Sequence, residues 1–196
     1  VAARAGASGA LNHYAEVSLG PWDAPVAMAA AEALLANHGL TLEADAAEEM
    51  VICLGSCIPY HVQLLVDHVA QDATRARRAS VAKLDVQRVY RTRILGSHGH
   101  TELAHMEERL LKVLPFELRA LATDILTQAA VRGNLSSNAA IKLGDRSLAD
   151  AAQVRSALKD ILAVLEHDGY LRREGGGWKF VSALLRDWWK ARHELF

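Results

Sequence analysis

The sequence gathers groups that could bind a metal in one short segment, GSHGHTELAHMEE. His98, His100 and His105 lie there, with Glu102 and Glu108 nearby. A zinc site needs three or four ligands that converge on one point. Helical spacing places His105 across from Glu102, but nothing in the spacing brings the two preceding histidines to the same point. We therefore interpret this segment as a polar entry into a helix and expect no metal site.

Two cysteines and two further histidines are the other reactive groups. Cys53 and Cys57 are four residues apart, with Gly55 between them. Two cysteines without further ligands cannot hold zinc, so we interpret them as buried thiols of a cytoplasmic protein. His61 and His68 are seven residues apart on an expected helix, and we interpret both as half-buried polar groups.

Catalytic motifs are absent from the sequence. It contains no GxxxxGK[ST] loop, no GxSxG and no HExxH, and no glycine is followed directly by lysine. A phosphate-binding loop of the Walker type is therefore not encoded here. We do not expect this chain to be a hydrolase by itself.

Charge is unevenly distributed along the 196 residues, although the formal net charge is only −1. Residues 1–72 carry one basic against nine acidic residues, whereas residues 73–93 carry seven basic residues against one acidic residue. We interpret the basic stretch as a solvated helix face or as a contact with the acidic block.

No apolar run approaches the length of a membrane span, and nothing resembles a secretory signal. The sequence opens on Val1 rather than on methionine. We therefore expect a piece of a longer protein that has no membrane partner.

Apolar periodicity and end signals predict a mainly helical chain. Alternation over 14–19 predicts one short strand, and Ser182 is expected to cap a final helix. Three consecutive glycines, Gly175 to Gly177, supply the positive φ that a tight hairpin needs. The predicted hairpin strands are 170–174 and 178–181, and Gly144 is expected to stop the helix that starts at 136. The predicted helices span 25–37, 43–54, 59–73, 83–95, 100–113, 116–131, 136–143, 148–167 and 183–195.

The order of three helices and a hairpin after Pro115 is that of a winged helix, a helix-turn-helix with an added two-stranded wing. Its third helix, 148–167, would read DNA, but its outward face mixes acidic with basic residues, which suits phosphate binding poorly. We expect one of the two adjacent tryptophans to face inward and the other to be exposed for an interface. The candidate DNA or partner contacts are Arg155, Lys159, Arg172, Arg173, Lys179, Trp188 and Trp189.

Six motifs follow one another along the chain: GASGALNHYAEVSLGPWD, EALLANHGL, GSCIPYHVQLL, DVQRVYRTRIL, SHGHTELAHMEERL and LEHDGYLRREGGGWKFVSALLRDWW. This ordered series resembles the C-terminal part of P-loop ATPases of the STAND and AAA+ group, both archaeal-type and bacterial. In that group a nucleotide-binding core is followed by a helical lid and then by a winged helix. The resemblance covers nearly the whole chain, and EHDGYL with the terminal SALLRDWW carries most of it.

The resemblance implies a role for three residues and a division of the chain. Ser8 and Gly9 resemble the small polar turn after the sensor-1 strand of the core. Pro59 resembles the proline that opens a lid helix and packs on the adenine base, although a plain helix initiator is the alternative. Cys57 stands where relatives often have another proline, which leaves positions 57 and 59 as alternatives for the base contact. The implied parts are 1–20, the end of the core; 21–95, the lid; 96–114, a connecting helix; and 115–196, the winged helix.

Because the phosphate loop and most of the core are missing, the resemblance implies a regulatory lid and winged helix without the catalytic site. ATP or ADP with magnesium would be bound by the intact protein and not fully by this chain. Implied partners are the missing N-terminal ATPase core, and another protein or a second copy. The alternative is a winged-helix transcriptional regulator that binds DNA through 73–93 and the wing. An α-helical adaptor, which needs neither nucleotide nor DNA, is a third hypothesis.

Overall fold

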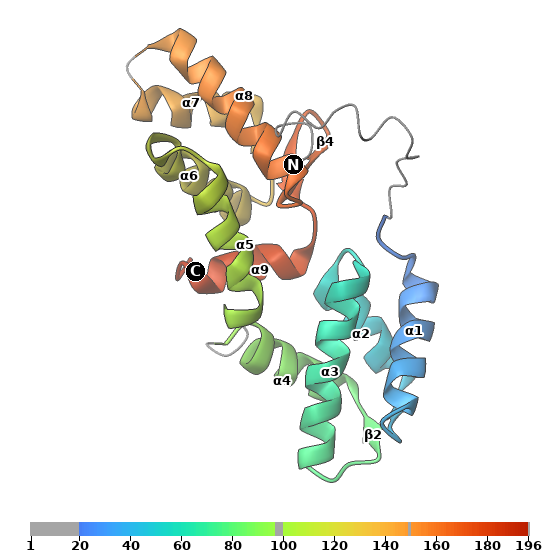
Figure 1. The fold of residues 1–196 in the computed structure, drawn as a ribbon. Helices are drawn as coiled ribbons and strands as arrows, with labels where there is room; N and C mark the ends of the chain where they lie inside the picture. Colours follow the sequence, from blue (N-terminus) through green and yellow to red (C-terminus); the bar gives the residue numbers. More distant parts are fainter. Residues whose placement is uncertain (1–19, 97–99, 149, 196) are drawn as a thin grey trace, which may run out of the picture.

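Segments rich in alanine, leucine and valine form helices over most of the chain. The computed structural model describes residues 20–96, 100–148 and 150–195, apart from the side chains of 100–102. Two groups of helices lie in series, with a small antiparallel sheet in the second (Figure 1). The mainly helical prediction is therefore confirmed for the described residues.

The N-terminal group contains the helices that the sequence predicted before residue 95, each within a few residues. A proline in the first turn starts both α1 and α3, where its missing N–H costs no hydrogen bond. Leu35, Leu54 and Leu65 are fully buried at the centre of this group. The elements are α1 Ala24–Ala36, β1 Thr41–Leu42, α2 Ala44–Leu54, α3 Pro59–Arg75, β2 Ser80–Val81, α4 Lys83–Val89 and the π-helix η2 Tyr90–Ile94.

A parallel pairing of β1 with β2 was not predicted. Thr41 lies opposite Ser80, and Leu42 lies opposite Val81. Strands of two residues are too short to produce an alternating sequence pattern. This pairing connects the end of α1 to the start of α4.

The basic stretch contacts the acidic block, as one of the two interpretations predicted. Arg88 donates hydrogen bonds to Asp72 at 2.7 Å and to Asp85 at 2.8 Å, and Arg78 bonds the same two carboxylates. Burial alone would raise the pKa of Asp72, but the hydrogen bonds from Arg88 and Arg78 hold it below its ordinary value. This cluster joins the end of α3 to α4 and pairs two of the seven basic residues of 73–93 with carboxylates.

Cys53 and Cys57 are free thiols, and Cys57 is buried while Cys53 is half-buried. Burial and the adjacent Glu49 carboxylate raise the pKa of Cys53 to about 12. Burial also raises the pKa of Cys57. The interpretation of both as structural thiols agrees with these surroundings.

The second group contains the predicted hairpin and a third strand that the sequence did not reveal. The strand β3 pairs with β5, so that the antiparallel order is β3-β5-β4. Gly175 and Gly176 have φ of 58° and 78° in the hairpin turn, as predicted. The elements are α5 His100–Val113, α6 Phe116–Arg132, β3 Leu135–Ser136, α7 Ser137–Ser147, α8 Ala151–His167, β4 Leu171–Glu174, β5 Gly177–Phe180 and α9 Ala183–Arg192.

Side-chain caps start the last three helices. The Oγ of Ser182 accepts a hydrogen bond from the Leu185 N–H at 3.2 Å, which confirms the predicted cap of α9. Ser136 and Asp150 cap α7 and α8 in the same way. Because Asp150 is the cap, α8 begins three residues later than the sequence predicted.

The prediction that Gly144 stops its helix is wrong, because α7 continues through this residue to Ser147. A Cβ at position 144 would lie 2.5 Å from Cγ1 of Val154. The glycine therefore serves the close approach of α7 to α8, and tertiary packing outweighs its low helix propensity.

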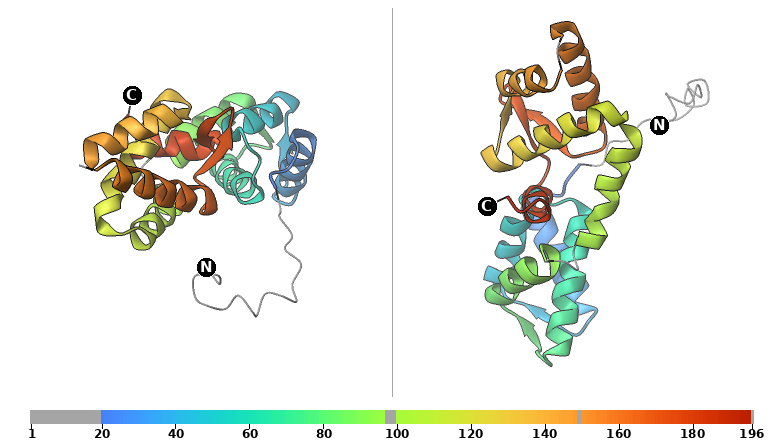
Figure 2. Two further views of the ribbon diagram at one scale, coloured as in Figure 1. Left: turned by 90° about the horizontal axis from the view of Figure 1, so that it is seen from above. Right: turned by 90° about the vertical axis from the view of Figure 1, so that its left-hand side faces the viewer.

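Helix α9 lies between the two groups and packs against both α6 and α2 (Figure 2). Trp188 and Trp189 on this helix are 0% and 1% exposed. The expectation that one of them is exposed for an interface is therefore wrong. Both rings are buried because α9 has neighbours on more than one side. The apolar pattern of one helix in the sequence cannot show how many sides of that helix will be covered.

Some expectations fall outside the described residues, namely the strand 14–19, Ser8, Gly9 and His98. Within the described ranges, the helices are all too short or too polar to cross a membrane.

Candidate functional site

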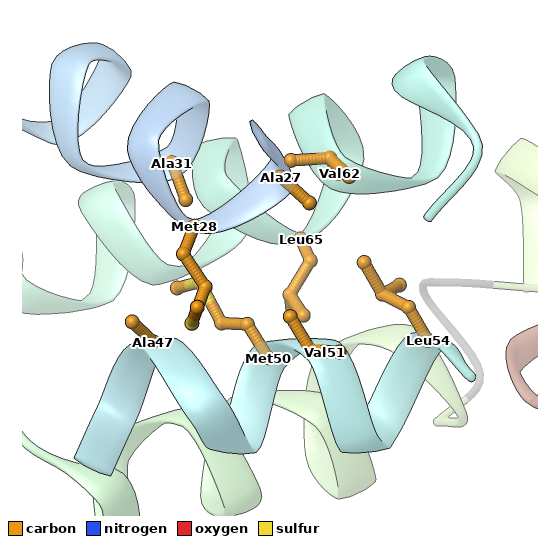
Figure 3. Close-up of a pocket in the computed structure, with 9 residues that line it drawn as sticks. All are labelled: Ala27, Met28, Ala31, Ala47, Met50, Val51, Leu54, Val62 and Leu65. Carbon is orange, nitrogen blue, oxygen red and sulfur yellow. The ribbon is translucent and has the colours of Figure 1, made fainter. Parts of the chain in front are cut away.

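The small space enclosed by α1, α2 and α3 is part of the apolar core and is no ligand site. Figure 3 shows Met28, Met50 and Leu65 among the side chains that point into it. Its volume is about 10 Å³, which leaves room for about one water molecule.

A much larger cavity, of about 300 Å³, lies where the two groups meet. The start of α3 contributes Ile58, Tyr60 and His61, and α5 contributes His105, Met106 and Arg109. The turn after α8 contributes Asp168, Gly169 and Tyr170, and α9 contributes Leu185. Because four parts of the chain line it, this cavity depends on how the two groups are placed. We refer to it as the intergroup cavity.

Three residues that line the intergroup cavity each have a buried polar atom without a hydrogen-bond partner among the described residues: His61 Nδ1, Asp168 Oδ2 and the Tyr170 hydroxyl oxygen. His61 is 5% exposed, Tyr170 is 1% exposed and the Asp168 side chain is 3% exposed. The other carboxylate oxygen of Asp168 accepts a hydrogen bond from Arg109 at 3.0 Å. Most buried polar groups in proteins are paired, so these three atoms are exceptions, and each is shielded from solvent and therefore not open to the cavity.

Burial fixes the protonation of two of these groups. It lowers the pKa of His61 to about 4, so the imidazole is neutral at pH 7. It raises the pKa of Tyr170, so the hydroxyl keeps its proton and can donate. Arg109 balances the charge of Asp168, and the two form an ion pair at the edge of the cavity. These four residues therefore add no net charge to the lining of the intergroup cavity.

The buried His61 makes folding stability depend on pH. The unfolded chain takes up a proton near pH 6.5, whereas the folded chain does not until about pH 4. The unfolded state therefore binds more protons across this range, and the free energy of unfolding falls as the pH decreases. We expect the titration of His61 to lower the free energy of unfolding by roughly 2–3 kcal/mol between pH 7 and pH 4.5.

Urea unfolding at pH 7 and pH 4.5 measures this effect. The unchanged chain loses stability between pH 7 and pH 4.5. In His61→Gln this loss should be smaller by roughly 2–3 kcal/mol. His68→Gln, on the same helix, is the control and should keep the full loss. Equal pH dependence in His61→Gln and in the unchanged chain would refute the assignment.

Pro59 lies beside the intergroup cavity and does not line it. It occupies the first turn of α3 and is half-buried, between the cavity residues Ile58 and Tyr60. The exposed side chains of Trp22 and Ile52 are also near this end of the N-terminal group, since the Trp22 N–H donates to the Cys57 carbonyl at 2.9 Å and Ile52 lies in the last turn of α2.

The candidate basic contacts are spread over α8 and the hairpin. Arg155 and Lys159 are exposed on α8, as predicted. Arg172 and Lys179 both form ion pairs with Glu174, at 2.9 Å and 2.7 Å. Arg173 instead lies over the Trp178 ring, 5.4 Å from its centroid. Three of the five basic side chains are thus engaged within the hairpin.

A second cavity of about 200 Å³ lies between the hairpin and the start of α9. Arg172, Lys179 and Arg186 line it. Each forms an ion pair with Glu174 or Asp187. The acidic partners offset much of the positive charge, so the second cavity is less suited to a ligand than the intergroup cavity.

Among the residues whose side chains are described, no three histidine, cysteine or acidic groups come close enough to hold a metal ion. The side chains of His100 and Glu102 lie outside that set, and His105 is an exposed residue of the intergroup cavity. Comparisons with protein-family models, with curated proteins and with solved structures found no match.

Sequence reasoning missed Asp168 and Tyr170 as site residues and assigned His61 a minor role. In the sequence, Asp168, Gly169 and Tyr170 belong to the motif EHDGYL, which predicted only a helix end followed by a strand. A polar residue and a tyrosine at a helix–strand turn are common, so the pattern alone gives no signal of a cavity. Their importance comes from contact with α3, more than 90 residues earlier.

Proposed function

We propose that this chain is the C-terminal regulatory part of an ATP-binding P-loop ATPase of the STAND and AAA+ group. The N-terminal group, within 21–95, would be the lid that closes over a nucleotide held by the missing core. The elements from 115 onward would be a winged helix that moves with the lid and presents a surface to a partner. Mg-ATP or ADP would be bound in the intact protein.

The observation that carries this proposal is the order of the two groups. A helical group comes first, and α5 connects it to helices α6, α7 and α8 followed by a hairpin. The third strand β3, between the first two of these helices, is what a winged helix commonly has. This order of elements supports the division into a lid and a winged helix that the motif resemblance implies.

Contacts between the groups support a coupling role. The Tyr90 hydroxyl on η2 bonds the Asp187 carboxylate on α9 at 3.2 Å. The end of α2 also touches the start of α9, because a Cβ on Gly55 would lie 2.7 Å from the Ala183 Cβ. A nucleotide that favours one lid position would therefore change contacts at α9.

The charges of the hairpin suit a protein partner, or a second copy of the chain, better than they suit DNA. Phosphate neutralisation dominates DNA affinity, and two hairpin cations already have a carboxylate partner. The Lys179 ammonium in particular lowers the pKa of Glu174, which keeps this acid ionised. The acidic residue would also repel a phosphate backbone.

The proposal is tested in the intact protein. Pro59→Ala should raise KM for ATP by about three- to tenfold, since it removes an apolar contact with the base worth on the order of 1 kcal/mol. Pro25→Ala is the matched control, because Pro25 also lies in the first turn of a helix in the same group. Its KM should be unchanged.

Two results would contradict the proposal. One is an intact reading frame whose upstream codons encode no GxxxxGK[ST] loop. The other is an equal effect of the two proline substitutions on KM, which would make Pro59 a plain helix initiator.

A further inference from the structure

The turn between α3 and β2 presents a serine that follows two arginines. Ser80 comes after Arg77, Arg78 and Ala79, so basic side chains stand three and two residues before its hydroxyl. No other serine or threonine in the sequence has basic residues at both of these positions. Serine kinases select substrates partly by their charge pattern, and a kinase with an acidic substrate cleft favours basic residues just before the serine. The segment has the charge pattern of such a substrate.

The structure leaves this segment open to a second protein. Residues 76–79 belong to no helix or strand, and both Arg77 and Ser80 are exposed. Arg77 forms no ion pair within the described part of the chain, whereas Arg78 is held by one carboxylate of α3 and one of α4. Figure 1 shows β2 in the turn after α3, at the end of the N-terminal group that lies away from α9. A kinase can therefore approach without meeting the second group.

Few interactions hold Ser80 in place. Among the described residues β2 pairs with β1 alone, and each strand has two residues. The Thr41 N–H donates to the Ala79 carbonyl at 3.0 Å, and the Ser80 hydroxyl donates to the Glu43 carboxylate at 3.1 Å. Exposed segments with so few contacts open locally at little cost in free energy. The segment can therefore enter a kinase cleft while the rest of the chain stays folded.

We propose that Ser80 is a phosphorylation site for a serine kinase with an acidic substrate cleft. The Ser80 oxygen attacks the γ-phosphorus of ATP that the kinase holds, and the new O–P bond replaces the bond from this phosphorus to the oxygen that bridges to the β-phosphate. ADP leaves, and the hydroxyl proton passes to the catalytic base of the kinase. This site is independent of the proposed ATPase role, so each can fail while the other stands.

The phosphate acts on the pairing of β1 with β2. Before the reaction, the Ser80 hydroxyl donates to Glu43 Oε1. A phosphoserine has lost this donor and carries a charge of about −1.5 to −2 at pH 7, so it meets the Glu43 carboxylate as a like charge. The exposed Arg77 offsets part of this repulsion. Because the pairing connects the end of α1 to the start of α4, phosphorylation loosens the N-terminal group.

Phosphate incorporation into the folded chain tests the site. The chain is incubated with Mg-ATP and the catalytic subunit of cyclic-AMP-dependent protein kinase, which selects serines that follow arginines. We expect a single phosphate, located on Ser80 by mass spectrometry of the digested chain, and none in Ser80→Ala. Ser147→Ala is the matched control, since Ser147 is exposed and directly follows Arg146 but lacks the two earlier basic residues. This variant should still accept the phosphate.

The role of charge is tested at Arg77. Arg77→Gln should lower kcat/KM of the kinase for this chain by about tenfold, because it removes one charged contact with the cleft. Arg77→Lys keeps the charge and should retain most of the rate. Arg75→Gln is the matched control, since Arg75 is also exposed but stands five residues before Ser80. It should change kcat/KM less than about twofold.

Thermal unfolding measures the structural consequence. Phosphorylation should lower Tm by about 2–4 °C, as suits one repulsive pair at the surface of a chain of this size. Glu43→Gln removes the like charge and should reduce this fall to about half or less. Glu48→Gln removes another exposed carboxylate of the same group and should leave the fall unchanged.

Three outcomes would overturn the proposal. The first is a folded chain that gains no phosphate on Ser80, whether or not a free peptide of residues 73–84 is phosphorylated. The second is the same kcat/KM for Arg77→Gln as for the unchanged chain, which would exclude recognition by charge. The third is an equal fall in Tm with and without Glu43, which would exclude the effect on the β1–β2 pairing.

Discussion

Trp188→Ala should lower the free energy of unfolding by about 3–5 kcal/mol, the largest effect that we expect from a single truncation. Trp188 is 0% exposed, and its ring lies edge-on to that of Trp189 with the centroids 6.4 Å apart. The helix that carries Trp188 packs against α2, α5 and α6, so a hole at this position would loosen packing in both groups. A small protein is stable by only about 5–15 kcal/mol, so a large part of the variant would be unfolded at moderate urea concentrations.

Urea unfolding followed by far-ultraviolet circular dichroism measures this loss, since the helical signal does not depend on the tryptophan removed. Phe116→Ala is the matched control, because it also truncates a large aromatic side chain but one that is 78% exposed. Its loss should not exceed about 1 kcal/mol, since the exposed ring contacts only the Arg119 guanidinium, 5.7 Å from its centroid, among the described ring contacts. Similar losses in the two variants would show that Trp188 is not buried as described.

Gly55→Ala should lower the free energy of unfolding by about 2–4 kcal/mol, for two separate reasons. Gly55 has a φ of 67°, a conformation that strains any residue with a Cβ. The added Cβ would also lie 2.7 Å from the Ala183 Cβ and 3.1 Å from the Ala183 backbone nitrogen. The backbone of α9 would have to move away from α2 to relieve this contact.

Gly39→Ala separates the two causes. Gly39 has a φ of 69°, and a Cβ there would meet nothing within 4 Å. Its loss should therefore reflect backbone strain alone, about 1–2 kcal/mol. The same urea unfolding experiment compares the variants. If Gly55→Ala costs no more than Gly39→Ala, α2 and α9 are not in close contact.

Local signals were sufficient to predict the helices of the described chain. Pro59, Ser182 and the glycines of the hairpin turn act within a few residues of themselves, so their effects can be read in sequence. The two-residue strands β1, β2 and β3 could not be predicted, since each exists only by pairing with a distant segment.

The errors share one physical cause, which is packing between distant segments. Gly144 looked like a helix end because the close approach of Val154 does not show in its neighbours. Trp189 looked like an interface candidate because its partner Thr127, at 3.3 Å, lies 62 residues earlier. The intergroup cavity was missed for the same reason, since His61 and Tyr170 line one cavity only in the folded chain.

The protonated state of the two cysteines has a practical consequence. A thiol reacts with maleimides and iodoacetamides as the thiolate, and a pKa near 12 leaves about one Cys53 in ten thousand in that form at pH 8. Cys57 is shielded by burial as well. The two cysteines of the unchanged chain should therefore react very slowly with thiol reagents, so they would interfere little with labelling at an introduced cysteine. A single cysteine introduced on the surface of each group would carry a dye pair and report the distance between the groups directly.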